Sequence, residues 1–140
     1  MLSLILVLLV IDQQSKVIAQ NLLANNIQLP FLTLVHNKGI AYGLFAGHIN
    51  ITIILSLIVL SGILLLRKQL FGTTILSSLS FIFILSGGIG NLLDRILRGY
   101  VIDFINIQII PVFNFADIYI NIGIFLLLIN FFIYEWKHQN

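Results

Sequence analysis

Charged residues are sparse along this chain, and they separate long apolar runs. The charge-free runs include residues 39–66, 69–93 and 118–134, which contain no Asp, Glu, Lys or Arg. A helix in lipid is apolar around its whole circumference, and about 20 residues of it cross the hydrocarbon core, so apolar runs near that length indicate membrane spans. The pattern predicts four spans, at about residues 1–20, 49–66, 70–93 and 117–134.

The composition agrees with a membrane-embedded chain. Of 140 residues, 59% are hydrophobic and 9% are charged, with a mean hydropathy of +1.10, whereas soluble domains average about 45–50% and 25%. This excludes a soluble enzyme and a disordered chain. The net charge of +2 is too small for a nucleic-acid-binding patch, so we expect no nucleic-acid partner. The absence of cysteine excludes disulfides and thiolate chemistry. We expect one domain, residues 1–140: an all-α polytopic membrane protein with four transmembrane helices.

Two longer segments, residues 21–48 and 95–116, join the first span to the second and the third span to the fourth. They should therefore lie on one side of the membrane. The turn at residues 67–69 should lie on the other side, together with the C-terminus. Lys and Arg residues are divided almost evenly between the two sides, so the positive-inside rule assigns no orientation.

Both long segments contain local structural signals. Apolar runs at residues 27–29 and 31–35 predict strands near the membrane interface. The glycines that follow favour turns or close backbone packing: Gly39, Gly43 and Gly47. In the second segment, Gly99 should lie just past the end of the third-span helix, and residues 100–104 should continue in extended or irregular form.

Four of the five acidic residues are aspartates at or near the long-segment ends of three spans: Asp12, Asp94, Asp103 and Asp117. Acidic side chains inside a bilayer are costly and are therefore functional candidates. Their position near one interface predicts a site reached from the membrane edge, rather than a conduction path through its middle. Asn114, Asp117 and Asn121 form a polar stripe on the fourth span.

Asp103 and Asp117 are separated by an apolar stretch containing Pro111, which would bring the two carboxyl groups face to face if it folds back. Two carboxylates held close in a poorly hydrated site do not both ionise easily, so the pair shares one proton. An aspartic protease needs that state, because one carboxylate takes a proton from water while the other donates to the scissile carbonyl. Spacing alone leaves a structural role for this pair open.

Simpler roles fit the remaining polar residues. Asp12 and Lys16 are four residues apart, as in a structural ion pair on one helix face. Asp94 with Arg95 suits a charge pair at a helix end. Clustered glycines favour close helix packing: Gly87, Gly88 and Gly90. The histidines show no metal-ligand spacing, so we expect no metal.

Five short motifs follow one another in the chain. Asp12–Lys16 reads DQQSK and fits DQxSK, and residues 37–42 read NKGIAY and fit N-x-G-x-A-F with Tyr for Phe. Residues 87–95, 99–104 and 113–117 fit GGxxGNxxDR, GxVxDF and FNxAD. Each motif alone is weakly specific. All five, in this order on a four-span background, resemble the bacterial lipoprotein signal peptidases, the type II signal peptidase family.

This resemblance implies an intramembrane aspartic endopeptidase that removes the signal peptide from diacylglyceryl-modified prolipoproteins by cutting before the lipidated cysteine. It implies that Asp103 and Asp117 are catalytic and that no cofactor is used. The residues implied in substrate binding or in support of the site are Asp12, Lys16, Asn37, Gly39, Asn91, Asp94, Arg95, Asn114 and Ala116.

The resemblance also implies a location. The protein would be a multi-pass protein of the bacterial plasma (inner) membrane, with both termini cytoplasmic and the active site near the extracytoplasmic face. Residues 21–48 would form a small extracytoplasmic β-rich cradle, partly over the site. The implied partners are lipid-modified prolipoprotein substrates and membrane lipid, and we expect a monomer.

Two other functions fit an apolar chain of this kind. A small proton-coupled transporter would use the same acids as proton carriers, but it would place them near mid-span and usually show internal symmetry, neither of which is visible in the sequence. A purely structural membrane subunit is the other alternative. Cleavage of a lipidated prolipoprotein in detergent, seen as a mobility shift on a gel, separates the peptidase from both.

Overall fold

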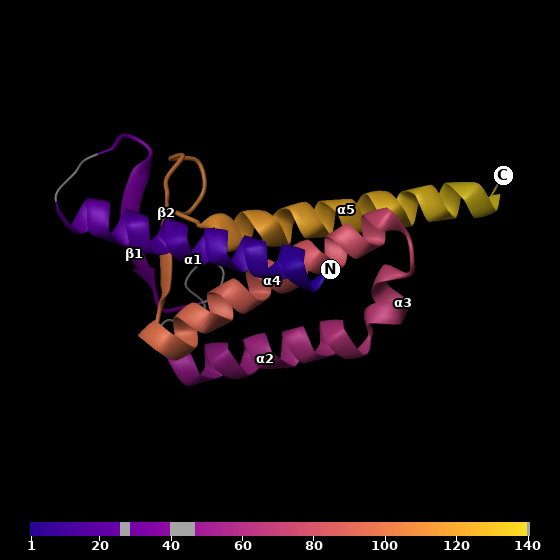
Figure 1. Cartoon of the computed structure of the whole chain (residues 1–140), viewed down its shortest axis with the longest axis horizontal. Coiled ribbons are helices and arrows are strands. Elements are labelled where there is room, and N and C mark those ends of the chain that lie inside the picture. The colour runs from indigo at the N-terminus through magenta and orange to yellow at the C-terminus, as the bar shows by residue number, and fades with distance from the viewer. Residues whose placement is uncertain (26–28, 40–46, 140) are drawn as a thin grey trace.

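The structure is a computed structural model that describes residues 1–25, 29–39 and 47–139. These residues form five helices and two strands (Figure 1). In chain order they are α1 (Leu2–Ala24), β1 (Leu32–Asn37), α2 (Ile49–Leu65), α3 (Arg67–Phe71), α4 (Ile75–Arg98), β2 (Val101–Ile105) and α5 (Phe115–Gln139). The mainly helical fold agrees with the prediction from sequence.

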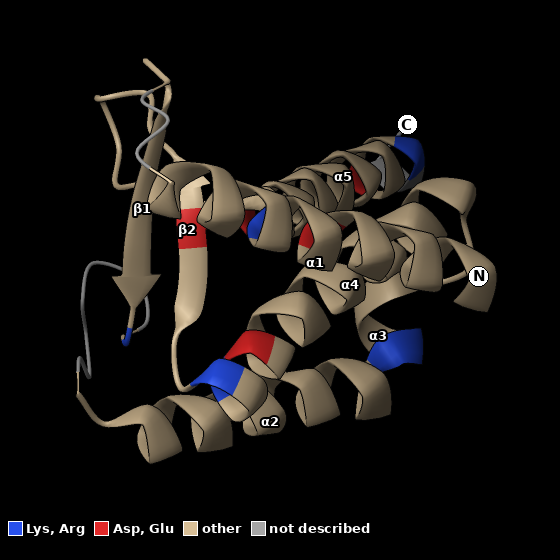
Figure 2. Ribbon diagram, turned by 60° about the vertical axis from the view of Figure 1, so that its left-hand side comes forward, with Lys and Arg blue, Asp and Glu red and all other residues tan. Residues whose placement is uncertain are grey.

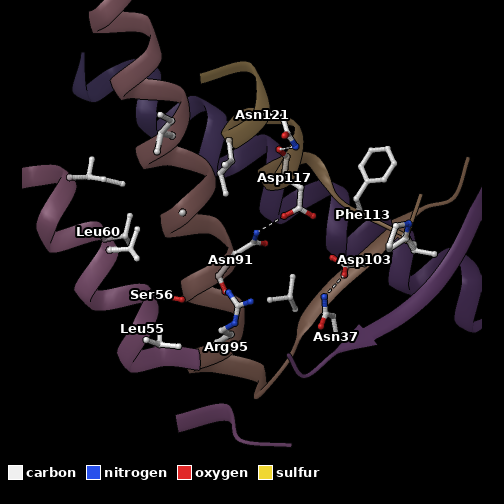
Figure 3. Close-up of a pocket in the computed structure, with 18 of the residues that line it drawn as sticks. Asn37, Leu55, Ser56, Leu60, Asn91, Arg95, Asp103, Phe113, Asp117 and Asn121 are labelled. Atoms are coloured by element: carbon white, nitrogen blue, oxygen red, sulfur yellow. Dashed lines mark hydrogen bonds between the residues drawn. The ribbon is translucent and has the colours of Figure 1, made fainter. Parts of the chain in front are cut away.

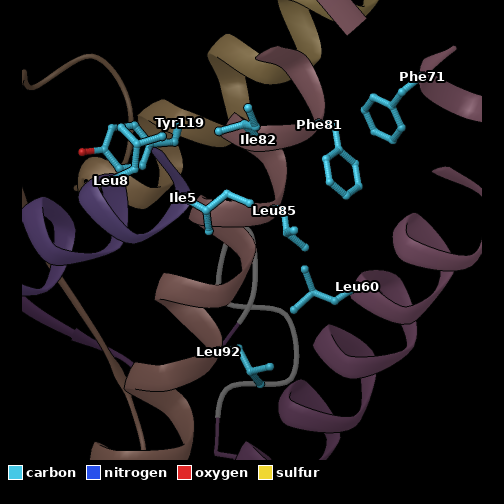
Figure 4. Close-up of a cluster of buried hydrophobic side chains, with 9 residues drawn as sticks. All are labelled: Ile5, Leu8, Leu60, Phe71, Phe81, Ile82, Leu85, Leu92 and Tyr119. Carbon is cyan, nitrogen blue, oxygen red and sulfur yellow. The ribbon is translucent and has the colours of Figure 1, made fainter. Parts of the chain in front are cut away.

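Helix α4 lies at the centre of the bundle, where it packs against α1, α2 and, most extensively, α5 (Figure 1). Helices α4 and α5 approach closely at Gly123, where an added Cβ atom would lie only 2.9 Å from the carbonyl oxygen of Ser80. The Ser80 hydroxyl donates a 2.6 Å hydrogen bond to the Gly123 carbonyl at the same place. Apolar side chains around α4 form the core (Figure 4): Ile5, Leu8, Leu60, Phe71, Phe81, Ile82, Leu85, Leu92 and Tyr119.

In the part of the chain that the structure describes, three helices are long and apolar enough to cross a membrane, namely α1, α4 and residues Phe115–Lys137 of α5. Helix α2 is also apolar, but it has 17 residues. At 1.5 Å per residue it is about 25 Å long, compared with a hydrocarbon core of about 30 Å. Large apolar side chains are exposed along α1, α2 and α5 and at the two ends of α4, a pattern that fits contact with lipid.

The apolar run expected to begin the third span at residue 70 is divided in two. Residues Arg67–Phe71 form the separate short helix α3, Gly72 adopts a φ of +63°, and α4 begins only at Ile75. The Thr74 side chain caps α4 by accepting a backbone N–H of its first turn at 3.0 Å. The predicted boundary is wrong because a left-handed glycine and a threonine cap interrupt a helix without reducing its hydrophobicity.

One strand from each long connecting segment contributes to a two-stranded antiparallel sheet at one end of the bundle (Figure 1). Val35 of β1 lies opposite Asp103 of β2, and Asn37 lies opposite Val101. The β structure expected from the first segment therefore takes its second strand from the segment before α5. This pairing places the end of β1 beside the Asp103 side chain.

The local predictions for these segments have different outcomes. The strand at residues 31–35 and the extended chain at residues 100–104 are confirmed by β1 and β2. The strand predicted at residues 27–29 lies mostly outside the described residues, and Leu29, which is described, is not in a strand. The turn predicted at Gly43 also lies outside the described residues. Helix α4 ends as predicted, because Gly99 has a φ of +80° and donates its N–H to the Arg95 carbonyl at 3.1 Å.

Candidate active site

Asp103 is buried in β2, with only 3% of the residue exposed. Its Oδ2 accepts a hydrogen bond from Nδ2 of Asn37 at 2.9 Å, and its Oδ1 accepts one from Nδ2 of Asn114 at 2.6 Å. Val35 lies opposite Asp103 in the sheet, and Asn37 comes two residues after Val35. Side chains two residues apart on a strand point to the same face, so the side chains of Asn37 and Asp103 lie on one face of the sheet. The sheet register therefore delivers one of the two donors, and the chain before α5 delivers the other.

Burial raises the pKa of the Asp103 carboxyl group from 3.8 to about 6, and the nearby negative charge of Asp117 acts in the same direction. The hydrogen bonds from Asn37 and Asn114 lower this pKa, because they favour the ionised form. A carboxyl group with a pKa of about 6 holds a proton far more often near neutral pH than an ordinary aspartate does. Asp103 is therefore suited to proton transfer.

Asp117 lies in the first turn of α5 and forms a reciprocal cap with Asn114. The Asn114 N–H donates to Oδ2 of Asp117 at 3.1 Å, and the Asp117 N–H donates to Oδ1 of Asn114 at 3.1 Å. This arrangement is a capping box, with an aspartate in the place of the more common Glu or Gln. Nδ2 of Asn91 in α4 donates to the other carboxylate oxygen of Asp117, Oδ1, at 2.8 Å. The carboxylate is thereby fixed at a helix N-terminus, where the helix dipole favours negative charge.

A single residue, Asn114, links the two carboxyl groups. It is fully buried, and it donates to Asp103 with its side chain and to Asp117 with its backbone N–H. Both aspartates line one cavity of about 650 Å³ (Figure 3). The fold-back predicted around Pro111 is confirmed, because Phe113 pairs with the end of β2 through backbone hydrogen bonds.

A second buried cluster lies beside this pair and centres on Lys16 of α1. Nζ of Lys16 lies 2.9 Å from Oδ2 of Asp12 and 2.9 Å from Oδ2 of Asp94. It also donates to Oδ1 of Asn91 at 3.2 Å. All three charged side chains are fully buried. The predicted ion pair between Asp12 and Lys16 is confirmed, and Lys16 forms a second ion pair with Asp94 of α4. We call Asp12, Lys16 and Asp94 the Lys16 cluster.

Two contacts connect the Lys16 cluster to the aspartate pair. Oδ1 of Asp12 accepts the backbone N–H of Ala116 at 2.9 Å, next to Asp117 in the first turn of α5. Asn91 accepts from Lys16 with its Oδ1 and donates to Asp117 with its Nδ2. The Lys16 cluster therefore holds the start of α5 against α1 and α4.

Asp94 does not pair with its neighbour Arg95, so this sequence prediction is wrong. Asp94 forms salt bridges with Lys16 and with Arg98, and it accepts the backbone N–H of Ile102 at 3.3 Å. Successive residues of an α-helix point about 100° apart, because 3.6 residues complete one turn. Arg98 lies four residues after Asp94 and shares its face, whereas Arg95 does not.

Arg95 lines the cavity instead. Its Nη2 donates to the carbonyl of Gly39 at 3.0 Å and its Nη1 donates to the carbonyl of Asn91 at 3.4 Å. The Gly39 N–H donates in turn to Oδ1 of Asn37 at 3.0 Å. Within the described part of the chain, the buried Nε of Arg95 has no hydrogen-bond partner. Arg95 therefore anchors the chain that follows β1 and places a positive charge near the aspartate pair.

The structure brings the predicted site residues into one region. Figure 2 shows charged positions on α1, α4 and β2 converging beside the sheet, while those of α3 lie at the opposite end. Sequence reasoning missed Gln13, whose Nε2 donates to Asp94 at 3.1 Å and to the carbonyl of Gly90 at 3.2 Å. Its place beside Asp12 in the DQQSK motif was the available signal. No group of three or more His, Cys, Asp or Glu that could hold a metal occurs in residues 1–25, 29–39 and 47–139.

Sequence reasoning also missed the apolar wall of the cavity, to which α2, α4 and α5 all contribute: Leu55, Val59, Leu60, Ile63, Ile84 and Ile120. An apolar residue in a membrane helix has the same pattern whether it faces lipid or lines a cavity. Only the packing of α2 against α4 distinguishes the two. The sequence therefore contains no signal for this wall.

The fold and this arrangement define a helical membrane protein with a buried and a half-buried carboxyl group beside one cavity. The profile of the Signal peptidase (SPase) II family matches residues 4–133, and the chain belongs to this family of peptidases. Family membership does not favour the transporter or the structural subunit considered from the sequence.

Named relatives and solved structures agree with this assignment. The lipoprotein signal peptidase of Fusobacterium nucleatum is 38% identical over 97% of this chain and 88% of its own length. That of Moorella thermoacetica is 39% identical over 90% of this chain and 88% of its own length. A bacterial membrane enzyme solved by the in meso method at 2.3 Å resolution superposes with a TM-score of 0.77 and 26% identity, covering 94% of this chain and 86% of the other.

Proposed function

We propose that this protein is an aspartic endopeptidase that removes the signal peptide from diacylglyceryl-modified prolipoproteins, cutting before the lipidated cysteine. The names of its relatives in F. nucleatum and M. thermoacetica support lipoprotein precursors as substrates. One observation carries the aspartic mechanism. Asp103 and Asp117 reach the same cavity and are joined through the buried Asn114.

In the proposed mechanism, Asp103 is the acid and Asp117 is the base. Asp103 is the more buried of the two, and its pKa of about 6 suits a group that arrives protonated. Asp117 takes a proton from water as the water oxygen bonds to the scissile carbonyl carbon, and Asp103 donates its proton to the carbonyl oxygen. The tetrahedral intermediate then breaks its C–N bond. The leaving amine receives the proton held by Asp117, and a hydroxyl of the intermediate returns its proton to Asp103 as the carbonyl re-forms.

The other residues of the site position these groups. Asn37 and Asn114 hold Asp103, whereas Asn91 holds Asp117 against α4. Arg95 fixes Gly39, so that Asn37 stays beside Asp103. No metal or cofactor is needed, because carboxyl groups supply both proton transfers.

We propose that all four long helices cross the bacterial plasma membrane, with the sheet and the site at the extracytoplasmic face and both termini in the cytoplasm. Four crossings return the chain to the side on which it began. The apolar wall of the cavity suits the acyl chains of a lipidated substrate, which would reach it from the surrounding lipid. We propose a monomer, since both carboxyl groups come from one chain.

The test is cleavage of a purified lipidated prolipoprotein in detergent, followed by mobility on a gel. Asp103→Asn and Asp117→Asn should each abolish cleavage, because an amide does not transfer a proton as a carboxyl group does. Glu135→Gln, which removes a carboxylate far along α5, should cleave at the wild-type rate. Thermal melts should show that each variant is folded. Turnover above trace by either aspartate variant would contradict the two-aspartate mechanism.

A further inference from the structure

Asn121 lies one helical turn beyond Asp117 on α5 and lines the same cavity (Figure 3). Its Nδ2 donates one hydrogen bond, to the Asp117 carbonyl at 2.9 Å. A side-chain amide has two N–H donors and an oxygen that accepts twice. Among the described residues, the second N–H and the oxygen of Asn121 form no further hydrogen bond. One donor and one acceptor are therefore available to a molecule in the cavity.

The surroundings of Asn121 make this spare capacity informative. Residues 118–134 carry no charge, and the cavity near Asn121 is lined by apolar side chains such as Ile84 and Ile120. Asn121 is exposed on α5, so in the proposed topology its free groups face the cavity and lipid rather than bulk water. Polar groups without partners are costly there, and those in membrane helices are functional candidates. Hydrocarbon tails offer no hydrogen bonds, so the partner must be polar.

The substrate main chain has the matching groups. A peptide bound for cleavage is extended around the scissile bond, so its N–H and C=O groups there lack helical partners. Inside a membrane little water is present to replace those partners. The amide of Asn121 presents the complementary pair, an N–H for a carbonyl and an oxygen for an N–H.

We propose that Asn121 is a positioning residue that binds the substrate main chain on the signal-peptide side of the cleaved bond. This inference rests on the proposed function. Asn121 is farther than Asp117 from the sheet end of the bundle, so in the proposed topology it lies deeper in the membrane, where the signal peptide enters. One helical turn is about 5.4 Å and an extended residue spans about 3.3 Å, which places the contact about two residues before the cleaved bond.

The first experiment measures steady-state cleavage by Asn121→Ala. We expect KM to rise about tenfold with kcat within about twofold, because two hydrogen bonds to the bound chain are lost. The melting temperature and the pH profile should match those of the wild type, since Asn121 touches neither carboxyl group through its side chain. Asn121→Gln should recover part of the affinity. The control is Ile122→Ala, a large-to-small change at the next position, which does not line the cavity.

The second experiment identifies the partner. Three lipidated substrates would each carry one ester in place of an amide, at the first, second or third residue before the cleaved bond. An ester lacks the N–H that would donate a hydrogen bond to the side-chain oxygen of Asn121. The substrate with its ester near the second residue should raise the KM of the wild-type enzyme several-fold. The same substrate should leave the KM of Asn121→Ala unchanged, because that variant lacks the accepting oxygen.

The outcomes separate this inference from the proposed function. If the wild type does not cleave the all-amide substrate, the proposed function fails, and this inference fails with it. If the wild type cleaves but Asn121→Ala keeps the wild-type KM, only the role of Asn121 is overturned. If KM rises but each ester penalty is the same in both enzymes, Asn121 does not bind the substrate main chain.

Discussion

The molecule holds two clusters of carboxyl groups side by side, one fully buried and one that includes the half-buried Asp117, and their charges are stabilised differently. In the Lys16 cluster, two aspartates share one ammonium group at 2.9 Å each. In the Asp103–Asp117 pair, the hydrogen-bond donors are the side chains of three asparagines and one backbone N–H. Among the described residues, no lysine or arginine forms a salt bridge with either member of that pair.

In the proposed mechanism, this difference separates the structural carboxyl groups from the catalytic ones. A buried cation shared by two carboxyl groups holds both in place, since removing one partner would leave an uncompensated charge in a low dielectric. Amide donors hold the position of a carboxyl group while stabilising its charge less strongly than a cation would. Asp103, which is held by amides and has a pKa raised to about 6 by burial, is the carboxyl group that we expect to exchange a proton. The Lys16 cluster serves to fix the helices around it.

The largest expected effect comes from Lys16→Met, which removes the shared cation. Asp12 and Asp94 would remain fully buried with like charges and fewer partners. We expect a loss of about 3–5 kcal/mol in stability, measured by thermal or denaturant melting in detergent. Lys38→Met, at an exposed lysine, is the matched control and should melt like the wild type. Equal melting of both variants would show that the Lys16 cluster does not hold the bundle.

A smaller effect of opposite sign is expected for Asp103→Asn. The pKa of Asp103 in the folded protein, about 6, lies above its ordinary 3.8. Its contribution to stability is therefore fully present below pH 3.8 and is lost as pH rises through about 6. The variant has no such loss, so it should be as stable as the wild type at neutral pH, or more stable by about 1–2 kcal/mol.

The measurement compares melts of the wild type and Asp103→Asn across pH. The stability difference between them should grow in favour of the variant from about pH 4 to about pH 6 and then level off. A variant that melts well below the wild type at neutral pH would place Asp103 with the structural carboxyl groups. The contrast between the two clusters would then be wrong.

The smallest expected effect is a movement of the pH profile. In the wild type, kcat/KM should fall as pH rises through about 6, because Asp103 must hold its proton in the free enzyme. The hydrogen bond from Asn37 lowers the pKa of Asp103, so Asn37→Ala should move this fall to higher pH by up to about one pH unit. Asn25→Ala, at an exposed asparagine, should leave the profile in place. A shift to lower pH would contradict the assignment of Asp103 as the acid.

Much of this arrangement could be predicted from short-range patterns. The end of α4 at Gly99, the extended chain after it and the fold-back around Pro111 follow from local backbone preferences. The ion pair of Asp12 with Lys16 follows from helical spacing. The FNFAD motif contained a further signal, because an N-cap asparagine followed three residues later by an acid predicts a capping box.

The pairing of Asp94 with Lys16 could not be predicted in the same way. Lys16 comes from a different helix, and the pairing depends on how α1 packs against α4. The pairing of β1 with β2 could not be predicted for the same reason. The two strands are far apart in the chain, and their register is fixed only when the helices assemble. Long-range packing, rather than local preference, decides both.

The start of α5 has a consequence for the biogenesis of this protein. Asp12, near the beginning of the chain, accepts the N–H of Ala116, and Asn91 from α4 holds Asp117. In the proposed mechanism, the aspartate pair is therefore complete only when α5 has docked against α1 and α4. A chain without a docked α5 carries Asp103 without Asp117 beside it, so we expect it to have no peptidase activity.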